Sequence, residues 1–122
     1  MRPSVHNRSG LGRLVSATRN SLRGLKAIFR SEEAFRMEAI ATLVLIPFAF
    51  WLDVSKVERV LLVASLLILL IVEMLNTAIE VVVDRIGTEI DPLSGMAKDV
   101  ASTSVMFALI LTGTVWGIIV LF

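Results

Sequence analysis

The chain contains no cysteine and no tyrosine, and only one histidine and three prolines among its 122 residues. The absence of cysteine excludes disulfides, thiolate metal sites and cysteine nucleophiles, and a single His6 in a polar stretch disfavours a histidine-based site. Charged residues are also scarce, at 19%. Hydrophobic residues reach 56%, above the roughly 45–50% of ordinary globular domains. This composition disfavours a soluble protein.

Positive charge is concentrated near the amino end. Eight of the twelve basic residues lie within residues 1–36, beside only two acidic residues, Glu32 and Glu33. Such an asymmetry is typical either of a nucleic-acid arm or of a cytoplasmic segment next to a membrane, where Lys and Arg are enriched. The apolar remainder of the chain favours the membrane, so we expect no nucleic-acid partner.

Three long apolar stretches predict an all-α membrane protein. Residues 100–122 are uncharged over 23 positions, more than the roughly 20 that a helix needs to cross the hydrocarbon core. The stretch 39–52 becomes long enough when it is extended back to Ala34, and the stretch 57–84 is rich in Leu, Ile and Val. We therefore expect three transmembrane helices at about 34–52, 57–84 and 98–121.

The basic segment before these spans has the pattern of an amphipathic helix. Residues 1–10 lack apolar periodicity and are expected to form a mobile tail. From 11 to 30, apolar residues recur at spacings of three, four and seven between Arg and Lys. We expect this helix to lie in the membrane interface, with its cations toward anionic headgroups. The three-span membrane domain then covers 31–122, with the amino end in the cytoplasm and the carboxyl end outside.

Cap patterns predict where the three spanning helices begin. Ser31 precedes two glutamates and resembles an N-cap with an acidic first turn. Ser55 starts a capping box with Glu58, and Asp91 precedes Pro92 in the arrangement of a cap followed by a proline at the first helical position.

Polar residues interrupt the middle span in a regular pattern. Glu73, Asn76, Glu80 and Asp84 are spaced so that they share one face of a helix. With a span of about 20 residues, Glu73 lies about 9 Å inside the cytoplasmic boundary. A carboxylate inside the membrane is costly and indicates a functional site. The alternative is a structural hydrogen-bond cluster between helices.

The chemistry of these groups favours a metal and a phosphate substrate. Carboxylates two turns apart at a membrane edge suit Mg²⁺, which takes one or two of them together with substrate phosphates, so Glu80 is a candidate ligand. Glu73, deeper in the apolar layer, is suited to accept a proton from a lipid hydroxyl. The connection 85–99 supplies glycines, acids and Lys98 beside the same end of the helix and is a weak candidate for holding a nucleotide.

The run 71–80, followed by 83–87, strongly resembles the signature of the bacterial integral-membrane diacylglycerol kinase family. Further blocks agree in order and spacing, and the resemblance covers about residues 11–120. These blocks are 32–36, 51–53 with 59–62, and 93–99. The resemblance implies a three-span homotrimer in the bacterial inner membrane with active sites shared between subunits. The implied reaction is MgATP-dependent phosphorylation of diacylglycerol to phosphatidic acid.

The same resemblance implies roles for individual residues. Glu73 is the general base for the lipid hydroxyl, while Glu32 and Glu80 hold Mg²⁺ on the phosphates of ATP. The residues expected to contact the nucleotide are Arg13, Glu32, Glu80, Glu89, Lys98 and Asp99. The residues expected to bind the lipid are Glu38, Glu73, Asn76 and Ser102.

Two alternatives remain at this stage. Family members from Gram-positive bacteria prefer undecaprenol, so an undecaprenol kinase is the alternative within the family, while overall similarity favours diacylglycerol. Asn20 and Asp91–Pro92 depart from the pattern of the best-known members, so the adenine and lipid contacts of the family are not carried over to these positions. Outside the family, a membrane glutamate in a short helical protein is also found in small proton-coupled transporters. The clustering of the acids at one interface, rather than at the midplane, disfavours a transporter.

Overall fold

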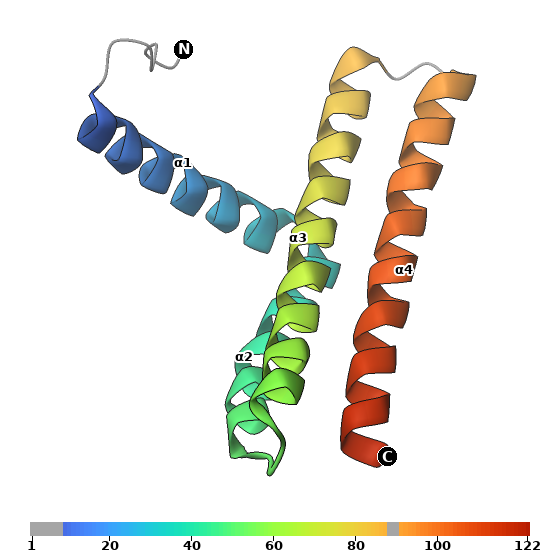
Figure 1. Cartoon of the computed structure of the whole chain (residues 1–122). Coiled ribbons are helices and arrows are strands. Elements are labelled where there is room, and N and C mark those ends of the chain that lie inside the picture. Colours follow the sequence, from blue (N-terminus) through green and yellow to red (C-terminus); the bar gives the residue numbers. More distant parts are fainter. Residues whose placement is uncertain (1–8, 88–90) are drawn as a thin grey trace.

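The computed structural model describes residues 9–87 and 91–122, and every regular element in this part of the chain is a helix. The helices are α1 (Gly10–Ser31), α2 (Glu33–Trp51), α3 (Lys56–Ile86) and α4 (Pro92–Leu121). Most of the expected tail 1–10, and Glu89 in the last connection, lie outside the described residues. Figure 1 shows α3 and α4 side by side, with α2 against the first half of α3 and α1 running sideways from the start of α2.

Two of the three expected helix starts are confirmed. The Ser55 hydroxyl accepts a hydrogen bond from the Glu58 backbone N–H, and the Glu58 carboxylate accepts one from the Ser55 N–H, which completes the capping box of α3. The Asp91 carboxylate accepts hydrogen bonds from the Leu93 and Ser94 N–H groups, and Pro92 occupies the first turn of α4.

The expected cap at Ser31 is wrong by one residue. Ser31 is the last residue of α1, and Glu32 is both the end cap of α1 and the N-cap of α2, without a side-chain cap hydrogen bond. The chain stays helical through Ser31 because the Arg36 guanidinium donates to the carbonyls of Phe29 and Arg30, at 2.9 and 3.0 Å. The Arg36 side chain of the next helix therefore supplies hydrogen bonds to carbonyl groups in the last turn of α1. The break between the two helices consists of one residue, Glu32.

Helices α2, α3 and α4 are each long and apolar enough to cross a membrane. Most of their large apolar side chains are exposed, and the buried apolar side chains of the described residues form a short series. That series is Ile28, Phe35, Ala49, Leu62, Leu66, Leu69, Ala101 and Ala108. An exposed apolar surface of this extent is satisfied by lipid rather than by water, so the protein is membrane-embedded.

Polar contacts tie α4 to the first half of α3. The Trp116 indole donates to the Leu62 carbonyl at 3.1 Å, and the Thr112 hydroxyl donates to the Ser65 carbonyl at 3.1 Å. The Phe48 ring of α2 stacks on Trp116, with ring centroids 6.4 Å apart. Side-chain hydrogen bonds of this kind are the usual means of joining helices where lipid surrounds them.

Candidate active site

The expected polar face of α3 is present in the structure. Glu73, Asn76, Glu80 and Asp84 all lie within this one helix. Their burial falls along the face, since Glu73 is only 6% exposed, Asn76 and Glu80 are half-buried, and Asp84 is exposed. The three carboxylates on this face of α3 are therefore progressively more exposed toward the end of the helix.

Glu73 faces a second carboxyl group from a neighbouring helix. The side chains of Glu38 on α2 and Glu73 on α3 are close enough to interact directly. One oxygen of each, Oε1 of Glu38 and Oε2 of Glu73, is buried without a hydrogen-bond partner in the described structure. Buried polar atoms are normally paired, so each of these two oxygens retains the capacity to accept a hydrogen bond from a further polar group.

Asn76 holds the next carboxylate of the same face. Its amide nitrogen donates to Oε1 of Glu80 at 3.0 Å. The Asn76 carbonyl oxygen is buried and has no hydrogen-bond partner among the described residues. The amide therefore orients Glu80 while it retains an acceptor of its own.

A cation from α4 reaches the open end of this face. The Lys98 ammonium forms an ion pair with Asp84 at 2.6 Å, and it also interacts electrostatically with Glu80. Both partners of the ion pair are substantially exposed, with relative side-chain accessibilities of 43% for Lys98 and 66% for Asp84. An ammonium group at this position is a donor that can bind an anionic group such as a phosphate. The spacing of the sequence had placed Asp84 on the face but had not paired it with Lys98.

The other expected residues among those that the structure describes lie on α1, at the junction of α1 and α2, and on α4. Glu32 is half-buried at the junction of α1 and α2, and Asp99 and Ser102 are exposed on α4. Arg13 is exposed near the amino end of α1, which projects away from α3 and α4 in Figure 1. The structure of one chain thus brings Glu38 to Glu73, Asn76 to Glu80 and Lys98 to the end of the same face, and it does not bring Arg13 to them.

The described residues contain no group of three or more His, Asp or Glu side chains arranged to hold a metal ion. Mg²⁺ commonly binds one or two carboxylates and fills its remaining positions with phosphate oxygens and water. Glu80 supplies such a carboxylate, already oriented by the amide of Asn76. The oxygen donors at this end of α3 therefore fit a hard divalent cation bound together with a phosphate substrate.

A cavity of about 450 Å³ separates α1 from the same stretch of α3. Its walls include Gly24 and Ser31 of α1 and Met74, Thr77 and Val81 of α3. Helix α1 therefore lies level with the carboxylate face, while α3 and α4 continue beyond it (Figure 1).

The fold and the site define a small integral-membrane protein, with three membrane-length helices and a cluster of carboxylates, an amide and a lysine toward one end of α3. The family model for prokaryotic diacylglycerol kinase matches residues 19–120. A diacylglycerol kinase of Haemophilus influenzae is 47% identical over 118 residues, which cover 97% of this chain and 100% of the relative. A diacylglycerol kinase of Pseudomonas aeruginosa is 48% identical, with 99% of both chains covered, and one of Escherichia coli is 45% identical, with 94% of both covered. The chain belongs to the prokaryotic diacylglycerol kinase family.

Proposed function

We propose that this protein phosphorylates the hydroxyl group of diacylglycerol with MgATP and produces phosphatidic acid and ADP. The observation that carries the proposal is the face of α3, where a buried carboxylate with an unpartnered oxygen, Glu73, is followed by the oriented pair of Asn76 and Glu80. The similar proteins of Haemophilus influenzae, Escherichia coli and Pseudomonas aeruginosa are diacylglycerol kinases, which supports the same reaction.

In this proposal, the protein lies in the bacterial inner membrane with its amino end in the cytoplasm and its carboxyl end outside. The segment 11–30 lies in the interface, after a tail at 1–10, and the membrane domain covers 31–122. The exposed apolar side chains of α1 support this placement, because Leu14 and Leu22 are 64% and 63% exposed on a helix that also carries several cations.

Glu73 is the proposed general base. It accepts the proton of the lipid hydroxyl as that oxygen bonds to the γ-phosphorus of ATP and the bond from this phosphorus to the leaving ADP breaks. Glu38, Asn76 and Ser102 are proposed to bind the lipid together with Glu73. The Glu38 oxygen and the Asn76 carbonyl oxygen that lack partners among the described residues support this role, because each can accept a hydrogen bond from a hydroxyl group.

Glu32 and Glu80 are the proposed ligands of Mg²⁺, which neutralises phosphate charge when it is bound. Residues proposed to contact the nucleotide, besides these two, are Arg13, Glu89, Lys98 and Asp99. The ion pair with Asp84 supports the proposed role of Lys98, because this pair holds the Lys98 ammonium group at the exposed end of the carboxylate face.

The protein is proposed to act as a homotrimer with active sites shared between subunits. Arg13 supports sharing, since its end of α1 projects away from α3 and α4 of its own chain (Figure 1). The apolar side chains exposed along α2 and α4 provide the surface that helix packing between subunits requires.

The test is transfer of labelled γ-phosphate from ATP by purified protein in mixed micelles containing diacylglycerol or undecaprenol, with and without Mg²⁺. We expect Mg²⁺-dependent labelling of diacylglycerol with the higher kcat/KM. Preferential labelling of undecaprenol would support the proposed phosphoryl transfer but would make undecaprenol the substrate. The similar proteins are diacylglycerol kinases and do not favour this outcome. A folded protein that labels neither lipid would contradict the proposal, and substrate-dependent proton flux would then favour a transporter.

A further inference from the structure

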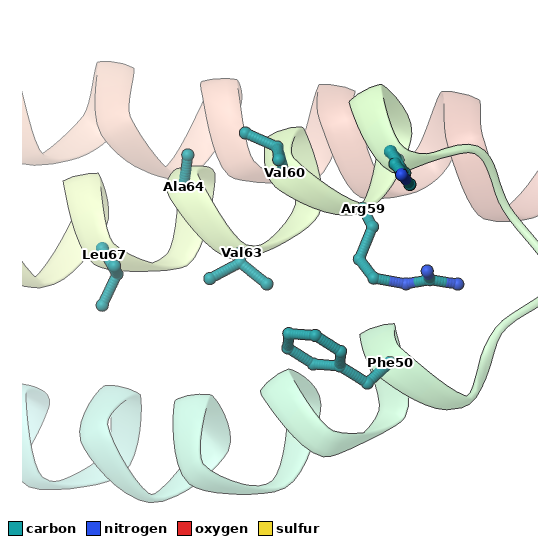
Figure 2. Close-up of a pocket in the computed structure, with 7 residues that line it drawn as sticks. Phe50, Arg59, Val60, Val63, Ala64 and Leu67 are labelled. Carbon is teal, nitrogen blue, oxygen red and sulfur yellow. The ribbon is translucent and has the colours of Figure 1, made fainter.

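A groove of about 490 Å³ opens between α2 and α3, at the end of the hairpin far from the carboxylate face. It is lined by Phe50 of α2 and by residues of the first three turns of α3. In Figure 2, Val63 and Leu67 point from α3 toward the helix that carries Phe50, and Val60 and Ala64 lie on the adjoining side of α3. Five of its seven lining residues are apolar, so the groove presents hydrocarbon surface for most of its lining.

The walls of the groove are apolar except at one end. Toward the α2–α3 connection, the lining residues are Lys56 and Arg59, and the remaining lining residues carry no charge. A cavity in a membrane span with hydrocarbon walls and cations at its mouth matches an amphiphile that has an acyl chain and a negative head.

Neither of the two cations forms an ion pair with an acidic side chain among the residues that the structure describes. Arg59 donates through Nε to the Ala49 carbonyl and through Nη2 to the Leu52 and Val54 carbonyls, all of which are neutral acceptors at the end of α2. Lys56 takes part in no ion pair within residues 9–87 and 91–122. The only acid in the first turn of α3, Glu58, is committed to the capping box with Ser55.

The geometry points to a binding site for an anionic phospholipid in this groove, with the phosphate against Lys56 and Arg59 and one acyl chain along Val63 and Leu67 toward Phe50. The occupant comes from the leaflet at the α2–α3 connection. Fourteen residues of α3 separate Arg59 from Glu73, which is about 21 Å along the helix axis. This lipid is therefore distinct from the substrate of phosphoryl transfer, and its binding does not depend on that reaction. Cations are depleted in outward connections, so Lys56 at this position needs a local partner, and the lipid phosphate supplies one.

The experiment is native mass spectrometry of the full-length protein, delipidated in detergent and titrated without ATP with phosphatidylglycerol or phosphatidylcholine of the same acyl chains. We expect the protein to retain phosphatidylglycerol at least about fivefold more tightly, the factor for one Lys or Arg near an anionic lipid. Lys56→Gln should reduce this preference by about the same factor. Arg85→Gln, which removes one cation from the opposite end of α3, is the matched control and should leave the preference unchanged.

A second pair of variants tests the walls of the groove. Ala64→Leu narrows the groove and should reduce retention of phosphatidylglycerol, whereas Ala41→Leu on the exposed surface of α2 should not. Equal retention of both lipids by the unmodified protein, or an equal effect of Lys56→Gln and Arg85→Gln, would overturn the proposal. If Ala64→Leu leaves lipid retention unchanged and instead weakens the association of subunits in the same spectra, the groove holds a second copy of the chain, and the proposal is also overturned.

Discussion

Replacing Glu73 with Gln separates the chemical role of this side chain from its structural role. The substitution keeps the shape of the side chain and removes its ability to accept a proton. We expect kcat to fall by about 10²–10⁴, the usual contribution of a general base, which corresponds to about 3–5 kcal/mol in the barrier. Folding should be maintained, because the new amide can donate a hydrogen bond to the carboxyl group of Glu38 that faces it in the structure.

The assay for this variant pairs two measurements on the same preparation. Transfer of labelled γ-phosphate to diacylglycerol in mixed micelles gives kcat, and unfolding in sodium dodecyl sulfate, followed by circular dichroism, gives stability. Glu58→Gln is the matched control on the same helix, since a capping box accepts either residue, and it should retain full activity. Full activity in Glu73→Gln would refute the assignment of the base. Loss of activity accompanied by loss of helix would refute the expectation that the site tolerates an amide.

Four further outcomes follow from the site and from the packing of α4. Glu80→Gln should raise the Mg²⁺ concentration for half-maximal activity at least about tenfold, measured by Mg²⁺ titration at saturating ATP. Lys98→Met should raise the KM for ATP at least about tenfold. Asp84→Asn should leave the unfolding midpoint in sodium dodecyl sulfate unchanged, because an exposed ion pair contributes little; a clear shift would contradict this account of the pair. Thr112→Val keeps the branched shape of the side chain and removes the hydrogen bond to the Ser65 carbonyl, so it should cost about 0.6 kcal/mol of unfolding free energy in the same denaturant, the mean for such bonds in membrane helices.

Local patterns predicted the helix starts well where the signal is contained in a few adjacent residues. Ser55 with Glu58 and Asp91 with Pro92 are caps in the structure, because each cap is made by neighbours in sequence. The prediction of a cap at Ser31 was wrong because the deciding contact comes from a residue outside the local pattern. The guanidinium of Arg36, on the following helix, satisfies the last carbonyls of α1 and carries that helix one residue further.

The same distinction applies to the site. The spacing of Glu73, Asn76 and Glu80 predicted one helix face, and the bond between the last two is an i to i+4 contact within that helix. The approach of Glu38 to Glu73, and of Lys98 to Asp84, joins different helices. Helical periodicity specifies which residues share a face, but it does not specify which residue of another helix meets that face, so these pairs required the packed structure.

The position of Glu73 and Glu80 on one continuous helix ties the proposed site to the thickness of the bilayer. Seven residues separate Glu73 from Glu80, about 10.5 Å of a continuous helix. If the first carboxylate serves a lipid hydroxyl and the second a hydrated phosphate, the boundary between hydrocarbon and water must fall inside that interval. A rigid helix cannot lengthen to follow a thicker membrane, so a bilayer that submerged Glu80 would keep the phosphate donor from its site. Membrane thickness would thereby control the rate of phosphoryl transfer without any regulatory domain.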